Sequence, residues 1–378
     1  MGKIKTATLT FHASHNYGSM LQAYALQQVL INELGVENTI INYRSDAQKR
    51  MYQSPEDKKH SWKYKIIKPL LIDKKSALIK KFHLFEKFLE EKLDVTPEFN
   101  DEKDVIDFAA NVDYLITGSD QVWNTHCYDF NWLYYLPFAK GNAIAYAPSM
   151  GPAGKNEVNA EYYPRINNCL RHYKSISVRE QGTADIIKSI SDKDVDILID
   201  PTLLINKETW DKLSGDEPII KGDYIFMYHP FINNQIYQIT KDISQKTGLP
   251  VYISNQLPYQ IELNKIYSGK RNLRYKLDAG PIEFLNLLKN AKLVISGSFH
   301  AVVFSIIFNK PFLAVNGKTD NRMSQLLRAT NLLEYGVNED DYLIALHNLS
   351  NIDFTKAALY IKKERENSLT YLNSALEL

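Results

Sequence analysis

Residues 293–315 read LVISGSFHAVVFSIIFNKPFLAV. The apolar runs at 293–296 and 312–315 predict buried strands, and the stretch at 299–308 predicts a helix between them. A helix that joins two such strands is typical of a parallel sheet covered on both faces. This stretch therefore predicts an α/β fold.

The same alternation of strand and helix continues toward both ends of the chain. The first helix begins near Ser19, has leucines at every fourth position and ends at Gly35. The turn-rich residues 201–223 predict a hinge between two domains. Further strands are predicted at 4–11, 39–43, 112–117, 143–147, 175–178, 195–199, 224–228 and 251–254, and further helices at 235–246, 281–289 and 322–329.

We expect two Rossmann-like, doubly wound domains, because 378 residues exceed one ordinary core. The N-terminal domain is predicted at 1–205, with an insertion at 49–92, and the C-terminal domain at 206–350. The tail, 351–378, is predicted to be a helix that packs back on the first domain. Ligands of such folds bind beyond the carboxyl ends of the strands, which predicts a site in the cleft between the domains.

Composition excludes several classes of protein. The formal net charge of +1 argues against a nucleic-acid binder. Cys127 and Cys169 have neither metal-binding nor disulfide spacing, so we expect a reducing cytoplasm and no metal site. The apolar run at 301–308 is far shorter than the roughly 20 residues that span a bilayer. The protein is therefore predicted to be soluble.

The segment 49–92 interrupts the alternation with thirteen basic and six acidic residues. Aromatic residues are interleaved with these charges. One interpretation is a set of amphipathic helices with a solvated basic face. The other is a peripheral contact with anionic glycolipid or phosphate at the inner face of the membrane.

The loop at 15–19, HNYGS, follows the first predicted strand. Gly18 permits close backbone approach, and Ser19 is a suitable helix N-cap. A ligand-binding loop and a plain capping loop both fit these residues. The side chains and backbone that a ligand would contact here are those of Asn16, Tyr17, Gly18 and Ser19.

The loop at 118–124, GSDQVWN, follows the strand predicted at 112–117. Asp120 can orient or deprotonate a sugar hydroxyl there, or it can cap a helix. Gln121 and Asn124 carry amides suited to binding hydroxyls. The loop therefore predicts a saccharide contact, with a structural cap as the alternative.

Arg179 leaves the end of the strand predicted at 175–178, just before a helix. Its planar fork of donors suits phosphate or carboxylate. The alternative is a salt bridge to Glu180 or Asp200. The sequence is compatible with both.

At the corresponding junction of the second domain, 296–301, His300 falls in the first turn of a helix. Imidazole is the side chain best matched to proton transfer near neutral pH. The small residues before it, among them Ser298, leave room for a ligand. A purely structural histidine is the alternative.

Five strings now resemble the polysaccharide pyruvyl transferase family in the same order along the chain. The resemblance covers roughly residues 5–330, and its specificity lies in the order of the strings. They are HNYGSMLQAYALQ at 15–27, GSDQVW at 118–123, SVRE at 177–180, DPT at 200–202, and the stretch from Gly280-Pro281 to SFHA at 298–301.

The resemblance implies a glycosyltransferase B-like fold, phosphoenolpyruvate as donor, and a saccharide acceptor of the cell surface or its lipid-linked precursor. The products would be a pyruvate ketal and phosphate, with no cofactor. Arg179 would bind the anionic donor, His300 would act on it, and Asp120 would assist the acceptor hydroxyl. Donor contacts in the C-terminal domain would add Ser298, Gly280 and Glu283. Acceptor contacts in the N-terminal domain would be Asn16, Tyr17, Gly18, Ser19, Gln121, Trp123 and Asn124.

Two positions depart from the commoner wording of this family. An Asp often stands where this chain has Gly297, and a Gly where it has Ala301. Two alternative functions therefore stay open. One is a nucleotide-sugar glycosyltransferase that binds diphosphate and ribose near Gly280, Pro281 and Glu283. The other is a noncatalytic saccharide-binding member of an envelope-assembly complex.

Overall fold

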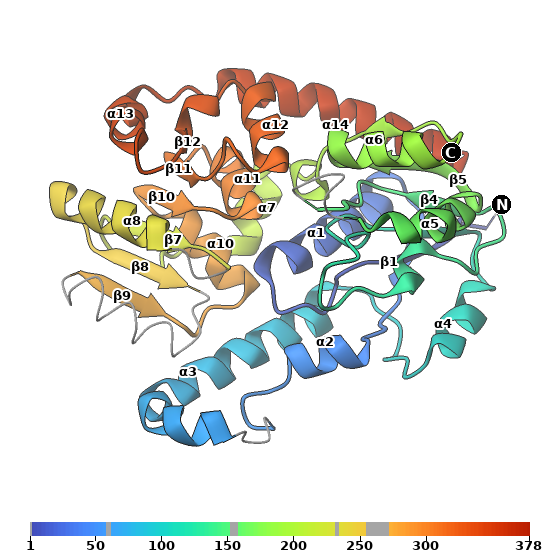
Figure 1. The fold of residues 1–378 in the computed structure, drawn as a ribbon, viewed down its shortest axis with the longest axis horizontal. Helices are drawn as coiled ribbons and strands as arrows, with labels where there is room; N and C mark the ends of the chain where they lie inside the picture. Colours follow the sequence, from blue (N-terminus) through green and yellow to red (C-terminus); the bar gives the residue numbers. More distant parts are fainter. Residues whose placement is uncertain (1, 58–61, 152–157, 231–233, 255–271) are drawn as a thin grey trace. The chain divides into compact units, whose positions relative to one another are not determined.

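The computed structural model describes residues 2–57, 62–151, 158–230, 234–254 and 272–378, with only the backbone at 62–73. It divides into two units, each built on its own six-stranded parallel sheet (Figure 1). The predicted α/β fold with two doubly wound sheets is therefore confirmed. The N-terminal unit comprises Met1–Tyr52, Leu89–Ile205 and Leu359–Leu378, and the C-terminal unit comprises Gln53–Phe88 and Asn206–Ala358.

In the N-terminal unit the strand order is β2-β1-β3-β4-β5-β6, and every pairing is parallel. The order changes direction between β1 and β3. A reversal of this kind opens a crevice at the carboxyl ends of the two strands, where ligands bind in such folds. The strands are β1 (Lys5–Leu9), β2 (Glu37–Ile40), β3 (Tyr114–Thr117), β4 (Ala143–Ala145), β5 (Tyr173–Val178) and β6 (Asp196–Ile197).

Helices pack on both faces of this sheet (Figure 1). The first, α1 (Tyr17–Gln28), is buried almost all round and continues as a π-helical turn, Val29–Glu33. Gly35 follows with a positive φ of 70°, so it ends the helix as the sequence predicts. The other α-helices wholly within this unit are α2 (Asp46–Met51), α4 (Glu102–Ala109), α5 (Tyr163–Leu170) and α6 (Gln181–Ile190), with 3₁₀ turns at Trp132–Tyr135, Ala160–Tyr162 and Pro201–Leu203.

In the C-terminal unit the order is β12-β11-β10-β7-β8-β9, again parallel throughout. Here the reversal lies between β7 and β10. The sequence predicted the four inner strands and missed the two edge strands, β9 and β12. The strands are β7 (Ile225–Tyr228), β8 (Val251–Ser254), β9 (Leu273–Lys276), β10 (Leu293–Ser296), β11 (Phe312–Val315) and β12 (Gly336–Val337).

Four helices of this unit, at 234–247, 281–289, 299–307 and 321–329, lie close to their predicted positions. A helix at 207–214, inside the stretch expected to be a hinge, and another at 342–348 were not predicted. All eight residues of β7 and β10 are buried, because helices cover both faces of the central strands. The helices are α7 (Lys207–Ser214), α8 (Asn234–Thr247), α10 (Pro281–Lys289), α11 (Phe299–Ile307), α12 (Asn321–Ala329) and α13 (Tyr342–Asn348), with 3₁₀ turns at Leu333–Tyr335 and Leu349–Asn351.

The insertion at 49–92 differs from its expected place in the first domain. Most of it, Gln53–Phe88, groups with the C-terminal unit and includes most of helix α3 (Trp62–Lys92). The reason is local contact, since the Lys80 ammonium lies 2.9 Å from the Asp278 carboxylate. Residues 58–61 of this insertion, and the side chains of 62–73, lie outside the described residues.

The tail forms helix α14 (Thr355–Leu376), whose residues from Leu359 onward belong to the N-terminal unit. The Tyr371 hydroxyl donates to the Ala145 carbonyl of β4 at 2.8 Å. The Arg365 guanidinium donates to the Leu204 carbonyl at 2.6 Å. Leu372 and Leu376 are buried beside these polar contacts, so apolar packing and hydrogen bonds both hold the helix on this unit.

Candidate functional site

Two loops meet at the strand reversal of the N-terminal unit, one after β1 and one after β3. In the first, the Asn16 side chain accepts from the backbone N–H groups of Gly18 and Ser19 and so caps α1. Sequence reasoning named Ser19 as the cap. The structure gives that role to Asn16 and leaves the Ser19 hydroxyl for another partner.

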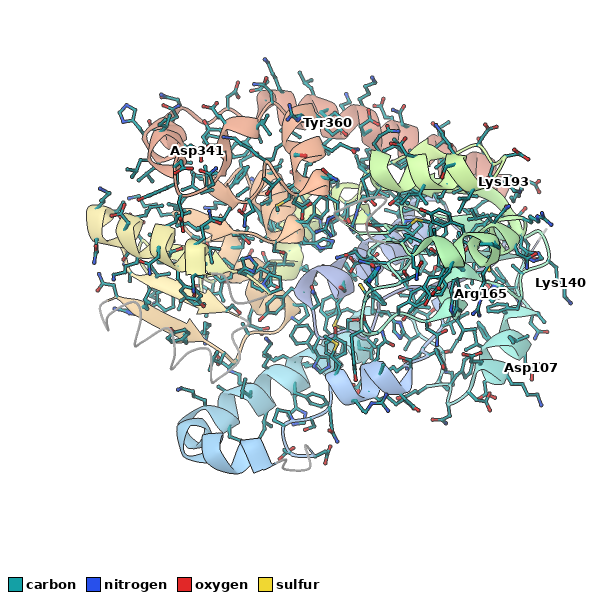
Figure 2. The ribbon with its side chains drawn as sticks, viewed as in Figure 1. Asp107, Lys140, Arg165, Lys193, Asp341 and Tyr360 are labelled. Atoms are coloured by element: carbon teal, nitrogen blue, oxygen red, sulfur yellow. The ribbon has the colours of Figure 1, made fainter. Side chains whose placement is uncertain are left out.

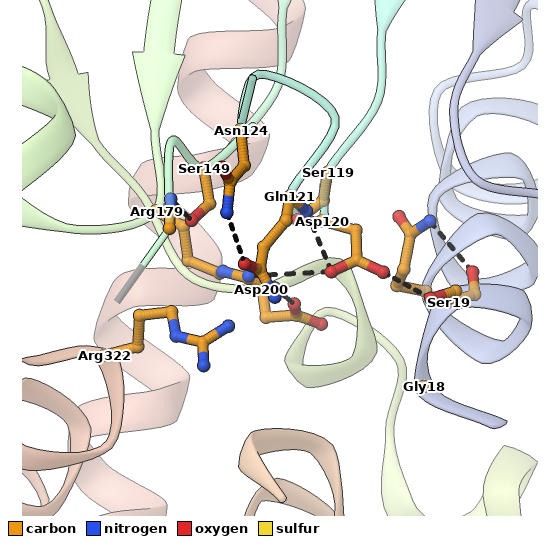
Figure 3. Close-up of polar contacts among 12 residues, drawn as sticks. Gly18, Ser19, Ser119, Asp120, Gln121, Asn124, Ser149, Arg179, Asp200 and Arg322 are labelled. Atoms are coloured by element: carbon orange, nitrogen blue, oxygen red, sulfur yellow. Dashed lines mark hydrogen bonds and ion pairs between the residues drawn. The ribbon is translucent and has the colours of Figure 1, made fainter. Parts of the chain in front are cut away.

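That partner is Asp120, the centre of the second loop. Its Oδ2 accepts from the Ser19 hydroxyl at 2.5 Å, and its Oδ1 accepts from the Gln121 backbone N–H at 2.9 Å (Figure 3). The two loops that the sequence singled out are therefore joined at this carboxylate. Asp120 is 6% exposed, so the carboxylate is almost removed from water.

The backbone at Asp120 lies in the left-handed region, with φ at 77°. A residue with a Cβ rarely adopts this conformation, which costs about 1 kcal/mol or more. The backbone carbonyl of Asp120 accepts from the Ser149 N–H at 2.8 Å, which helps to hold the turn. Strain of this kind at the end of a central strand is typical of a functional position.

Gly118, just before this turn, allows the β1 and β3 loops to approach closely. A methyl group on Gly118 would lie 2.8 Å from the Cβ of Thr10. The Thr10 hydroxyl donates to the Ser119 carbonyl at 2.9 Å and accepts from the Gln22 amide at 2.9 Å. Any larger residue at 118 would therefore displace the loop that carries Asp120.

Arg179 lies at the end of β5, beside the same carboxylate. Its Nη1 donates to Asp200 Oδ2 at 2.7 Å, and its Nη2 lies 3.8 Å from Asp120 Oδ1 (Figure 3). Glu180 Oε2 lies 3.8 Å from the guanidinium Nε. The salt bridge that the sequence left open as an alternative is thus present. Asp200 is itself held by Thr202, whose N–H and hydroxyl both donate to its Oδ1.

Carboxyl groups outnumber the guanidinium in this cluster. Burial lowers the pKa of Arg179, but Asp200, Asp120 and Glu180 raise it by more, so the guanidinium stays charged. One guanidinium faces three ionisable carboxyl groups. An arginine engaged in this way orients the carboxylates around it more readily than it receives a phosphate.

The other acceptor residues expected in these loops divide into two groups. Asn124 donates to the Gln121 side chain at 3.0 Å, so these two amides lie together next to Asp120 (Figure 3). Tyr17 and Trp123 have no exposed surface. The Trp123 ring stacks on Tyr135 with centroids 5.0 Å apart, and its N–H donates to the Tyr134 carbonyl at 3.1 Å.

Trp123 is therefore placed in the hydrophobic core of the N-terminal unit instead of at an acceptor surface. The packing continues from Tyr135 to Trp132, whose ring centroid lies 5.5 Å from that of Tyr135 and 3.9 Å from the Arg165 guanidinium carbon. Arg165 itself is exposed (Figure 2). An indole at the centre of such a cluster stabilises the fold chiefly through buried area. The buried Trp123 side chain thus anchors the end of the loop that carries Asp120.

Sequence reasoning missed a second buried carboxyl group near Asp120. Asp129 is 7% exposed, and burial is the largest cause that raises its pKa, with the Asp120 carboxylate adding to the effect. Tyr52 lies nearby, and its ring stacks on His15 at 5.6 Å between centroids. Asp129 lies in an irregular loop, where no strand end marks it in the sequence.

In the C-terminal unit, Ser298 and His300 lie at the reversal between β7 and β10. Ser298 is the N-cap residue of α11, and its N–H donates to the Ser296 hydroxyl at 3.0 Å. His300 follows in the first turn and is 8% exposed. The sequence thus correctly placed this histidine at a helix N-terminus beyond a central strand.

A second histidine, His229, follows β7 at the same reversal. Its Nε2 lies 2.7 Å from the point that a Cβ on Gly297 would occupy. The ring therefore fills the space above Gly297, which gives a physical reason for glycine at this position. Sequence reasoning missed His229, although it directly follows a predicted strand, as the other candidate residues do.

The other two residues that were expected to bind the donor substrate, Gly280 and Glu283, lie at the start of α10, after the edge strand β9. The Glu283 carboxylate accepts from the Gly280 N–H at 3.0 Å, which is one half of a capping box. A Cβ on Gly280 would lie 2.5 Å from the Cβ of Leu84, so this glycine serves packing against α3. Both residues thus have local structural roles at a different junction from His300.

Another cation missed from the sequence lies beside α11. Arg322, on α12, pairs with Asp320 at 2.7 Å, and its guanidinium carbon lies 5.9 Å from the Phe299 ring centroid.

Within the described ranges no group of three His, Cys, Asp or Glu residues is arranged to hold a metal ion. No helix in the same described part of the chain is long and apolar enough to cross a membrane.

Comparison with solved structures shows the fold. S. aureus MnaA, solved with UDP, is 13% identical and has a TM-score of 0.58, with 100% of this chain and 98% of that chain covered. A UDP-N-acetylglucosamine 2-epimerase from Rickettsia bellii is 10% identical, with a TM-score of 0.56 and coverage of 100% and 98%. A putative UDP-N-acetylglucosamine 2-epimerase from Listeria monocytogenes is 11% identical, with a TM-score of 0.57 and coverage of 97% and 91%.

These likenesses support a glycosyltransferase B-like fold with two sheets, and they carry no argument about chemistry at such low identity. No curated protein matches the chain. The family comparison is more specific, because the polysaccharide pyruvyl transferase model matches residues 16–319. That range contains Asp120, Arg179 and His300. The chain therefore belongs to the polysaccharide pyruvyl transferase family.

Proposed function

We propose that this protein transfers a pyruvyl group from phosphoenolpyruvate to a hexose of a cell-surface polysaccharide or its lipid-linked precursor, and that the product is a pyruvate ketal. Membership of the family supports pyruvyl transfer. The observation that carries the donor assignment is the place of His300, in the first turn of α11 at a strand reversal. A helix N-terminus there favours an anionic ligand.

His300 in its protonated form donates a proton to the methylene carbon of phosphoenolpyruvate. This step places oxocarbenium character on the carbon that bears the phosphate. An acceptor hydroxyl adds to that carbon and gives up its proton, and the C–O bond to phosphate breaks. The second hydroxyl of the same hexose then adds to the same carbon and gives its proton to His300, which restores the acid as the ketal closes. A positioned acid or base of this kind contributes about 10² to 10⁴ in rate.

Asp120 is the base that we propose for the acceptor hydroxyl. Its carboxylate is held by Ser19 and by the Gln121 N–H, and the amides of Gln121 and Asn124 lie next to it. Such amides can bind neighbouring hydroxyls of the same sugar ring. Arg179 is the positioning residue that fixes Asp120, through its ion pairs with Asp120 and Asp200.

Arg322 supplies the cation for the donor in this scheme, a role first expected of Arg179. It lies beside Phe299 at the start of α11 and pairs with one carboxylate, Asp320. Because the Asp320 carboxylate offsets part of the positive charge of Arg322, the N-terminus of α11 is needed as well to bind the anionic donor. The predicted binding of both substrates in a cleft between the domains stays a prediction.

The test is release of phosphate from phosphoenolpyruvate in the presence of hexose-containing acceptors, with the ketal identified on the sugar by mass spectrometry. His300→Ala should lower turnover about 10²-fold or more while the fold is kept. His347→Ala is the matched control, because His347 is an exposed histidine of the same unit. Near-wild-type turnover in His300→Ala would refute the acid role.

The contact with membrane is a separate proposal that rests on the charge of residues 49–92. Each basic residue near an anionic surface contributes about 1 kcal/mol. Lys80 pairs with Asp278 and Lys49 pairs with Glu98, so the contact would depend chiefly on other basic residues of the segment. Binding to vesicles that contain anionic lipid should weaken with salt and vanish on charge reversal of this segment. Equal binding to neutral vesicles would contradict it.

A further inference from the structure

His229 and Gly297 occupy equivalent positions on the two strands at the reversal in the C-terminal unit. Tyr228 pairs with Ser296 in the parallel register of β7 and β10. The Ser296 hydroxyl also donates to the Tyr228 carbonyl at 2.6 Å. The next residues, His229 and Gly297, are therefore brought level with each other just beyond the sheet.

The imidazole of His229 takes up the space that the glycine leaves. Its Nε2 and Cδ2 lie 2.7 and 2.8 Å from the ideal Cβ position of Gly297, and the Val315 carbonyl oxygen lies 3.3 Å from the same point. Real Cβ atoms essentially never approach other atoms under 3.0 Å. A side chain at 297 and this placement of the ring exclude one another.

The ring is also next to the start of α11, since Gly297 directly precedes the N-cap residue Ser298. Burial lowers the pKa of His229 to about 4. The ring is then uncharged at neutral pH and offers one N–H donor and one acceptor nitrogen. An uncharged ring can stand near a protonated His300 without repulsion between two cations.

We propose that His229 is a ligand-binding residue of this site and that its ring donates a hydrogen bond to an anionic oxygen of phosphoenolpyruvate. The inference rests on the proposed donor and adds a residue that neither the sequence motifs nor the helix N-terminus supply. Gly297 is then required because it admits the ring. His229 and Gly297 therefore act together in this proposal.

The experiment measures the dissociation constant of phosphoenolpyruvate, by calorimetry on the full chain, for wild type, His229→Ala, His229→Gln, Gly297→Ala and the His229→Ala/Gly297→Ala double variant. A hydrogen bond to a charged group is worth roughly tenfold to a hundredfold in affinity. His229→Ala should weaken binding by that factor. His229→Gln keeps a donor and should recover most of it.

The double variant separates this account from a general effect on packing. Gly297→Ala should weaken binding when His229 is present, because the methyl group displaces the ring. It should add no further loss in the His229→Ala background, where the ring is gone. Thermal unfolding of each variant reports the fold, and His347→Ala is the control for removal of a histidine.

Wild-type affinity in both His229→Ala and His229→Gln would overturn the inference while the proposed function stands. So would lower thermal stability with an unchanged dissociation constant, because a purely structural ring predicts that outcome. An equal penalty for Gly297→Ala in both backgrounds would show that the two residues do not act together. Wild-type protein that binds no phosphoenolpyruvate would overturn this inference and the proposed function alike.

Discussion

Arg179→Ala is expected to destabilise the N-terminal unit before it affects any ligand. The substitution removes the 2.7 Å partner of Asp200 and leaves Asp120 and Glu180 without the guanidinium between them. Arg179 is 5% exposed and Asp200 is 1% exposed, so water cannot replace the lost charge. Breaking a buried ion pair by removal of one partner costs about 3–5 kcal/mol.

For a domain of this size, 1 kcal/mol shifts the unfolding midpoint by about 2–4 °C. The loss expected for Arg179→Ala is therefore roughly 6–20 °C in a thermal melt followed by near-ultraviolet circular dichroism. Arg165→Ala is the matched control, because Arg165 is exposed and its guanidinium lies over the face of the Trp132 ring. The control should change stability by about 1 kcal/mol or less.

A midpoint for Arg179→Ala within about 2 °C of wild type would refute this reasoning, since it would mean that the three carboxylates do not need the guanidinium. The result also decides how a binding experiment is interpreted. If the fold is lost, weaker ligand binding in Arg179→Ala reports the fold and says nothing about a direct contact with the donor.

Three further predictions follow from single positions. Asp120→Gly and Asp120→Ala should both lower turnover in the phosphate-release assay, but Asp120→Gly should be the more stable of the two by about 1 kcal/mol in urea unfolding, because both lose the carboxylate and only glycine adopts φ 77° without strain; equal stability of the two variants would contradict the strain. Gly118→Ala should cost about 1–3 kcal/mol, because its methyl group would meet Thr10 at 2.8 Å, and unchanged unfolding would refute that contact. The free energy of unfolding should fall by up to about 3 kcal/mol as the pH drops from 6.5 toward 4, because His229 is protonated in the unfolded chain but not in the folded one over this range. His229→Gln should lose less stability over the same range, and equal losses would contradict the role of His229.

The inner strands were predictable because they are buried on both faces. The runs at Ile225–Tyr228, Leu293–Ser296 and Phe312–Val315 are continuous and apolar, as a covered parallel strand requires. The two edge strands of the C-terminal unit were not predictable in this way. Leu273–Lys276 reads LRYK and is only partly buried, and Gly336–Val337 has two residues, too few for any period.

The candidate residues show the same division between local and tertiary information. The rule that ligands bind beyond the carboxyl ends of the strands located Asp120 and His300, since both lie shortly after a central strand. It could not show that Arg179 is engaged by Asp200, because that contact joins residues 21 positions apart in the sequence. It also assigned Trp123 to a surface, although the residue type alone favours burial as much as sugar binding.

His229 lies at the kind of strand end where ligands bind, but its position alone does not distinguish it from other residues that follow strands. It directly follows β7, the partner of β10 at the reversal, but nothing in its immediate neighbours marks it. Its significance appears only with the structure, where its ring occupies the space beside Gly297. Such a relation between two distant residues depends on strand order, which the pattern of a single segment does not contain.

The measurement that tests the central claim most directly is equilibrium binding of phosphoenolpyruvate to the purified wild-type protein, with a nucleoside diphosphate titrated in parallel. The account predicts saturable binding of phosphoenolpyruvate, and release of phosphate once a hexose acceptor is added. Binding of the nucleoside diphosphate with no binding of phosphoenolpyruvate, with or without acceptor, would contradict pyruvyl transfer and favour a nucleotide-sugar substrate.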